Sequence, residues 1–173
     1  MFKPENNEYD KQLNSYINNY IDLVPDEDLN LLFSSYTNYE FFKSIPIEKQ
    51  NFRYSENKWS IKEILSHLID CERLFSFRGL WIARNMLSEQ PSYDENIAAK
   101  YSNANDREYK DILDEYYFVR KSTESLYKSF NNEMLLKTGK FDGKIASVKA
   151  LGFIILGHEL HHIKIIKQKY LEV

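Results

Sequence analysis

The sequence contains few of the residues that interrupt regular secondary structure. Glycine and proline number only 5 and 4 in 173 residues, about 5% where globular proteins average about 12%, and no glycine precedes residue 79. A β-sandwich or β-barrel needs a turn every ~8–12 residues, usually marked by such residues. The chain is therefore predicted to be mainly helical.

Cysteine and surplus basic charge are also scarce. The single cysteine, Cys71, excludes a disulfide framework and a metal site made of cysteines alone. Charged residues make up 28% of the chain, with a net charge of −3. Because there is no excess of Lys and Arg to bind phosphates, nucleic acid is not an expected partner.

No segment has the pattern of a membrane span or a secretory signal. The longest apolar stretch runs from Ala150 to Gly157, far short of the ~20 residues that cross a bilayer. No apolar region follows Lys3 near the N-terminus. We therefore expect a cytoplasmic protein that has no membrane partner.

Apolar residues recur every three or four positions in five segments, which predicts five helices. Their expected ranges are 8–23, 29–43, 61–86, 109–130 and 148–171. Ser60 and Glu63 form a capping box for the third helix, Asn105 and Glu108 resemble another, and Ser147 can cap the last helix. Polar residues 89–104 predict a loop, and residues 131–146, which include Gly139 and Gly143, predict a loop that has room for a short hairpin.

The length and spacing of these segments favour an all-α single domain over residues 1–173. Three long helices and a shorter one, with short connections, predict a four-helix bundle with a core over about residues 28–171. The segment 8–23 is then an additional N-terminal helix.

Three of the four histidines lie close together near the C-terminus. At about 100° per residue, His158 and His162 both lie on the apolar stripe of the last helix, and His161 lies at its border. Two imidazoles one turn apart match the spacing that chelates a divalent ion. The alternative is a pair of hydrogen-bonded core histidines, although each buried ring then needs polar partners.

The fourth histidine, His67, lies on the shoulder of the apolar stripe of helix 61–86, one turn before Cys71. Together with His158 and His162 it would complete a neutral site for a divalent ion with open coordination positions. Glu72 lies on the apolar face of its helix and Glu159 lies off the stripe of the last helix. Either glutamate is a candidate to orient a ligand. No cofactor other than the metal is expected.

Residues 158–162 also match the protease motif H-E-x-x-H. Metzincins need a further histidine at position 168, which is Gln168, and only eleven residues follow His162. We therefore do not favour a protease.

Two stretches carry a resemblance to a known family. Residues 58–73, which read KWSIKEILSHLIDCER, continue with Phe75 and Arg78, and residues 157–163 read GHELHHI before Tyr170-Leu171. Both stretches resemble signatures of the DinB-like superfamily, which includes the YfiT-type metal-dependent hydrolases. The resemblance covers about residues 28–171.

This resemblance implies a bundle of the DinB/YfiT type that is often dimeric and holds a divalent metal. The implied ligands are His67, His158 and His162, which leaves His161 either as a bystander or as a residue that supports one of the ligands. Related proteins resemble thiol-S-transferases that use bacillithiol or mycothiol, mycothiol-dependent isomerases, or hydrolases.

Two functional hypotheses follow. In the first, Zn²⁺ or Ni²⁺ on the three histidines activates a low-molecular-weight thiol or water for transfer to, or hydrolysis of, a small electrophilic substrate. In the second, the protein is a non-catalytic metal-stabilised bundle or a stress-associated binding protein. Cys71 would then be a fourth ligand that closes a structural site.

Overall fold

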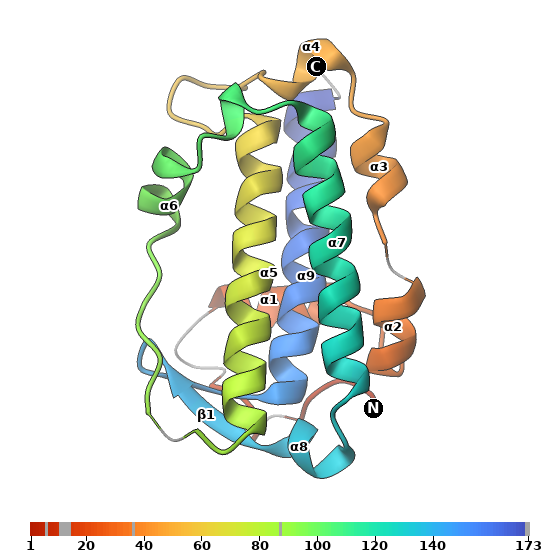
Figure 1. The fold of residues 1–173 in the computed structure, drawn as a ribbon, viewed down its shortest axis with the longest axis vertical. Coiled ribbons are helices and arrows are strands. Elements are labelled where there is room, and N and C mark those ends of the chain that lie inside the picture. Colours follow the sequence, from red (N-terminus) through yellow and green to blue (C-terminus); the bar gives the residue numbers. More distant parts are fainter. Residues whose placement is uncertain (6, 11–14, 36, 87, 172–173) are drawn as a thin grey trace.

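Three long helices form the frame of the protein in the computed structural model, which describes residues 1–5, 7–10, 15–35, 37–86 and 88–171. They are α5 (Ile61–Ala83), α7 (Tyr109–Lys128) and α9 (Val148–Ile166), followed by a π-helical turn at Lys167–Leu171. They run side by side, and α5 packs against both α7 and α9 (Figure 1). The predicted all-α bundle is confirmed.

The fourth column of the bundle consists of two short helices, α2 (Leu29–Ser35) and α3 (Tyr39–Lys43), followed by α4 (Ile47–Gln50). The prediction of one helix over 29–43 is therefore wrong. The hydroxyls of Ser34 and Ser35 both donate to the carbonyl of Leu31 at 2.9 and 2.7 Å. Such side chains compete with the helical backbone and favour an end to the helix. Both pieces still pack on α7 (Figure 1).

The additional N-terminal helix, α1 (Ser15–Leu23), crosses behind α9 (Figure 1). The prediction that it begins at residue 8 is wrong, because Tyr9 pairs with Ala146 as a β-bridge and the amide of Asp10 donates to Ile145. Part of that prediction, residues 11–14, lies outside the described residues. A Cβ at Gly157 would lie 1.9 Å from the carbonyl oxygen of Tyr20, so glycine there allows the two helix backbones to touch.

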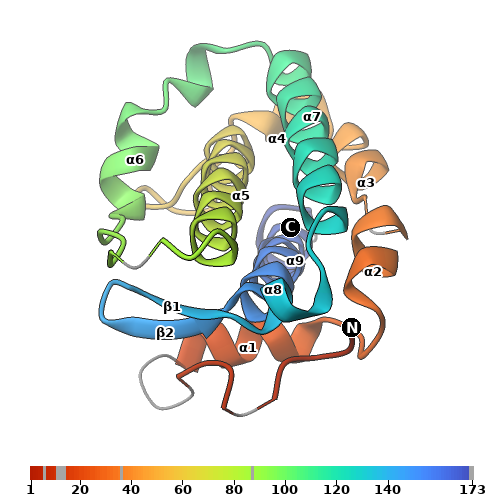
Figure 2. The same ribbon diagram turned by 60° about the horizontal axis from the view of Figure 1, so that its bottom comes forward.

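The predicted hairpin is confirmed and lies across one end of the bundle (Figure 2). Its strands, β1 (Thr138–Phe141) and β2 (Lys144–Ser147), pair antiparallel. Asp142 and Gly143 have φ values of 50° and 70°, as the tight turns of two-residue hairpins require. Helix α8 (Asn132–Leu136) precedes the hairpin and was not predicted.

The segment between α5 and α7 is more regular than predicted. α5 ends at Ala83 rather than at 86, and the expected loop at 89–104 contains α6 (Glu95–Tyr101) and leads into a 3-10 turn at Ala104–Asp106. Asp94 caps α6 by accepting from the amides of residues 96 and 97. A short polar helix with so few apolar positions has no clear periodicity.

The helix caps are as predicted for α5 and α9 but not for α7. Ser60 and Glu63 form the capping box of α5, and the Ser147 hydroxyl caps α9 at 2.9 Å from the amide of residue 150. The expected capping box at Asn105 is wrong, because Glu108 occupies the N-cap position of α7 and makes no side-chain cap bond. The side chain of Asn105 bonds Ser60 and Glu63 instead.

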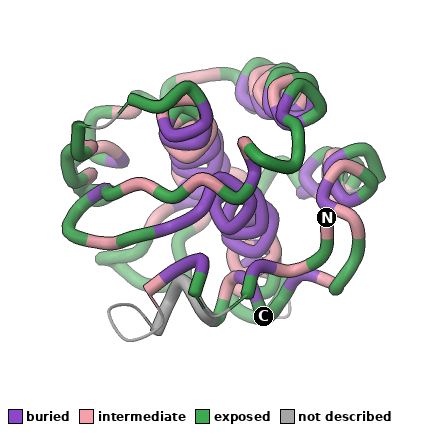
Figure 3. Tube along the Cα trace, turned by 90° about the horizontal axis from the view of Figure 1, so that it is seen from below, coloured by how far each residue is buried: buried purple, intermediate pink, exposed green. Residues whose placement is uncertain are grey.

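Two apolar clusters fill the two halves of the bundle, and a polar layer separates them along all three long helices. In α9 the buried apolar residues of one cluster end at Leu156, and those of the other begin at Ile163. Leu160 lies between them, is partly buried and packs against the first cluster. The layer between contains buried Glu72, Arg120, His158 and Glu159. Most residues of α9 are themselves buried, and Figure 3 shows long buried stretches of chain in the centre of the bundle. Among the described residues, no helix has the length and apolar character to cross a membrane.

Candidate metal centre

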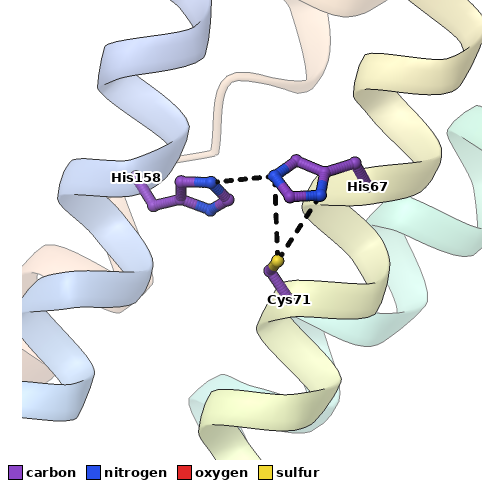
Figure 4. A group of neighbouring side chains, drawn as sticks. All are labelled: His67, Cys71 and His158. Atoms are coloured by element: carbon purple, nitrogen blue, oxygen red, sulfur yellow. Dashed lines mark hydrogen bonds between the residues drawn. The ribbon is translucent and has the colours of Figure 1, made fainter. Parts of the chain in front are cut away.

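The rings of three histidines meet in the polar layer. Nε2 of His158 lies 3.1 Å from Nε2 of His67 and 3.1 Å from Nε2 of His162. His67 comes from α5 and the other two from successive turns of α9, and Figure 4 shows the first of these contacts. The three rings stand at 69–87° to one another, so their nitrogens rather than their faces converge.

Aromatic side chains enclose these rings. The centroid of Trp59 lies 4.7 Å from that of His67, and Tyr20 and Phe75 lie 5.2 and 6.4 Å from His158. Burial lowers the pKa of His67 to about 4 and that of His162 to about 3, and it moves the pKa of His158 in the same direction. All three rings are therefore neutral near pH 7, which is the form that binds metal.

The nitrogens do not satisfy one another by hydrogen bonding. A neutral imidazole nitrogen offers either one proton or one lone pair, yet Nε2 of His158 faces two partners at 3.1 Å. Nδ1 of His162 is buried and has no hydrogen-bond partner in the part of the chain that the structure describes. Ligand nitrogens around a tetrahedral ion at about 2.05 Å are separated by about 3.3 Å. The donor set and its spacing therefore fit a divalent ion.

Cys71 lies beside the same cluster. Its sulfur is 3.6 Å from Nδ1 and 3.8 Å from Nε2 of His67 (Figure 4). The candidate ligand atoms of His67, Cys71 and His158 all lie within 4.8 Å of one another, a group that could hold a metal ion. Burial raises the pKa of the thiol to about 12, so the free thiol is protonated and must lose its proton to act as a ligand.

The two candidate glutamates contact an arginine rather than the histidines in the described hydrogen bonds. Arg120 of α7 donates from Nε and Nη2 to Glu72 at 2.8–3.1 Å and from Nη2 to Glu159 at 2.9 Å. Tyr116 donates its hydroxyl proton to the other oxygen of Glu159. This buried network joins α5, α7 and α9 next to His158.

The expectation that Glu159 lies off the buried stripe is wrong. Its side chain is 2% exposed, because α9 is covered by α1, α2 and α5 and has little free surface around this turn. Arg120 was not identified from the sequence. It follows Tyr116 by four residues on the apolar stripe of α7. A charged residue at such a position indicates a buried side chain that needs an ionic partner, and this was the feature of the sequence that could have identified it.

The same contacts bear on the H-E-x-x-H motif. In a metalloprotease the glutamate serves as general base beside the metal. Here both carboxylate oxygens of Glu159 are engaged by Tyr116 and Arg120. The position of the glutamate does not match that role.

The cluster opens onto a cleft of about 460 Å³. Its walls come from α1, α5, α9, the hairpin and the segment around α6, and they include all four histidines. The ring of His161 packs on Tyr20 at 5.3 Å and on His162 at 5.4 Å. His161 therefore lines the approach to the cluster without joining it through a described hydrogen bond.

Comparison with protein families matches residues 37–166 to the family described as the DinB superfamily. No curated protein matches the chain. Among solved structures, YfiT from Bacillus subtilis is described as a probable metal-dependent hydrolase with an unusual four-helix bundle topology. It is 13% identical to this chain with a TM-score of 0.68, and the match covers 96% of this chain and 90% of that one. The similarity shows that the two proteins share a fold.

Proposed function

The chain belongs to the DinB superfamily, and from this premise we propose that it is a divalent-metal-dependent enzyme acting on a small molecule. His67, His158 and His162 are the proposed ligands. The observation that carries the proposal is that Nε2 of His158 lies 3.1 Å from Nε2 of His67 and 3.1 Å from Nε2 of His162, beside a cleft. The description of YfiT as a probable metal-dependent hydrolase supports it.

Such an ion, when bound, polarises a substrate and lowers the pKa of a coordinated water or thiol. The chain's own residues supply the setting for this chemistry. His67 and His158 fix the donors on two different helices, and the pairing of Arg120 with Glu72 and Glu159 holds these helices together. Trp59 and Tyr20 pack on the rings and limit the access of water.

Metal content provides the direct test. We expect one divalent ion per chain after metal-replete purification, and a loss of that ion in His158→Ala and in His162→Ala. His161→Ala is the matched control, because it removes an adjacent imidazole that also lines the cleft. Elemental analysis after gel filtration checks this. Equal metal content in His158→Ala and the wild type would contradict the proposal.

A structural metal site is the alternative, and the sulfur of Cys71 at 3.8 Å from Nε2 of His67 is the observation that favours it. A fourth protein ligand would close the coordination sphere, as in structural zinc sites. The variant Cys71→Ser separates the two. Retained metal together with binding of an added thiol supports the enzyme, whereas loss of the ion supports the closed site.

We further propose that the ion is Zn²⁺ or Ni²⁺ and that the co-substrate is a low-molecular-weight thiol or water. The reaction is then thiol transfer to, or hydrolysis of, an electrophile. Parallel assays with an activated ester and with an aryl chloride plus thiol distinguish these reactions. If the protein turns over neither probe in a metal-dependent way, the result favours the non-catalytic alternative, which includes a stress-associated binding protein.

We also propose that the protein is a cytoplasmic homodimer. Light scattering tests the dimer, which should have twice the 20.7 kDa mass of the chain.

A further inference from the structure

A second polar group lines the cleft and plays no part in the proposed metal centre. Arg78 of α5 is only 4% exposed, and no carboxylate lies within 4.0 Å of its guanidinium among the described residues. Its Nη2 donates to the carbonyl of Pro91 at 2.8 Å, but its Nε is buried and has no hydrogen-bond partner within the described ranges. A buried cation with an unused donor is costly unless an anion completes it.

The surroundings of Arg78 hold it in place without neutralising it. The guanidinium lies 4.4 Å from the ring centroid of Phe141 and 5.7 Å from that of Phe75, a cation–π arrangement that fixes its plane. Both aromatic residues line the same cleft as the histidines. The two aromatic rings therefore hold the guanidinium of Arg78 at the wall of the cleft.

The charged residues near Arg78 do not supply its counter-ion. Asp142 of the hairpin turn acts on it electrostatically, but its carboxylate accepts from Nζ of Lys144 at 2.9 Å and is about half exposed. Glu95 at the start of α6 lines the cleft and is exposed. Burial outweighs the attraction of Asp142 and lowers the pKa of Arg78. The guanidinium still stays charged, because arginine does not lose its proton in proteins.

Tyr93 supplies a second unused donor in the same cleft. Its hydroxyl oxygen is buried and makes no hydrogen bond to any residue that the structure describes. The carbonyl that Arg78 contacts belongs to Pro91, two residues earlier in the chain, so this segment and Arg78 are directly linked. Two unpartnered donors, one of them cationic, match an oxyanion acceptor.

We propose that the cleft contains a carboxylate-binding subsite in which Arg78 and Tyr93 hold the anionic end of a small molecule with an apolar body. Arg78 follows His67 by eleven residues, which places both on one face of α5 about 16 Å apart along its axis. Arg78 and the histidines line the same cleft. The ligand spans the length of the cleft, with the carboxylate at Arg78 and its other end toward the imidazoles.

This inference deepens the proposed function by naming a substrate class, and only the placement of the reacting end rests on that function. The subsite itself consists of protein donors and does not need a metal. Binding is therefore measured on the metal-free protein, with 3-phenylpropionate as the probe and its neutral analogue 3-phenylpropionamide as the comparison. Both probes carry the same apolar body, so the difference reports the carboxylate.

We expect calorimetric titration to give at least tenfold weaker binding of the amide than of the carboxylate to the wild type. Arg78→Gln should reduce carboxylate binding at least tenfold, and Tyr93→Phe should reduce it severalfold. Arg84→Gln is the matched control, because Arg84 follows the last residue of α5 and is exposed. It should bind the probe as the wild type does.

Several outcomes would overturn the subsite. These are equal binding of acid and amide, undiminished binding to Arg78→Gln, or binding that appears only after the metal is added, since the carboxylate would then bind the ion. If Arg78→Gln does not fold, the amide comparison and Tyr93→Phe decide the matter. Metal content, measured on the metal-replete preparation before the ion is removed for titration, keeps the two proposals apart. A preparation that held the ion but ignores the carboxylate after chelation refutes only the subsite. A preparation that holds no ion after metal-replete purification but binds the carboxylate refutes only the metal centre.

Discussion

At the scale of single residues, burial of the three imidazoles makes the stability of the metal-free protein depend on pH. His67, His158 and His162 have no carboxylate partner among the described contacts, and their pKa values are lowered by burial. The unfolded chain binds a proton on each near pH 6.5, whereas the folded chain does not. Folding and protonation of these rings therefore oppose each other.

We predict that the metal-free protein loses stability as the pH falls below about 6.5 and continues to lose it toward pH 4, where His67 itself protonates. Each histidine contributes a slope of up to about 1.4 kcal/mol per pH unit in this window and none above it. Urea unfolding at pH 7, 6 and 5 measures it. His158→Leu should flatten the slope, and an unchanged slope in that variant would contradict the assignment.

A second prediction concerns Arg120, which is 1% exposed between Glu72 and Glu159. Arg120→Met leaves two buried carboxylates without a cation, so we expect a loss of about 3–5 kcal/mol in the free energy of unfolding. Lys121→Met is the control, because the side chain of Lys121 is 42% exposed and Glu124 keeps a second cation, Lys128, so we expect a loss of about 1 kcal/mol or less. Equal losses in the two variants, measured by denaturant unfolding, would show that the network is not a buried one.

Much of the candidate site was accessible from the sequence at this scale. The i, i+4 spacing of His158 and His162 and the position of His67 beside the stripe of α5 pointed to the residues that the structure brings together. The role of these residues as ligands stays a prediction. Tyr93 was not predicted because it lies outside any periodic segment, and only the tertiary fold brings it to the cleft.

At the scale of helices, the contact between α1 and α9 is set by one glycine. Gly157 precedes His158, and any side chain there would overlap the backbone of Tyr20. A backbone atom cannot turn away as a flexible side chain can, so the helix itself must move. The wall that α1 contributes to the cleft depends on this contact.

We therefore predict that Gly157→Ala displaces α1 while the rest of the bundle remains folded. Amide hydrogen exchange should increase in α1 and stay protected in α5 and α7. Gly152→Ala is the control, because its nearest atoms belong to the side chains of Leu29 and Tyr127. It should perturb α2 and α7 instead. Unchanged exchange in α1 of the Gly157→Ala variant would contradict the close contact.

The long helices could be predicted and the short ones could not, for a physical reason. α5, α7 and α9 carry enough buried apolar positions to define a helical period, and Ser60 and Ser147 mark two of their starts. α6 and α8 depend on local caps at Asp94 and Asn131 and have few apolar positions. The break between α2 and α3 preserves the apolar stripe, so periodicity alone does not reveal it.

At the scale of the whole molecule, a metal held by α5 and α9 links helices from distant parts of the chain. Binding to the folded state alone contributes about 4 kcal/mol when the free ion is at 1,000 times its Kd. For a domain of this size that corresponds to roughly 10 °C in Tm. We predict a fall of this order after chelation, recovery on adding the ion back, and no response in His158→Ala. Calorimetry with an unchanged Tm after chelation would contradict a link of this kind.

In the proposed site, three imidazoles from two helices bind one ion. Crystals grown from metal-replete protein, with diffraction data collected on both sides of the zinc and nickel absorption edges, test it most directly. We expect a single anomalous peak within bonding distance of Nε2 of His67, His158 and His162. A peak elsewhere, or none beside these nitrogens, would contradict it.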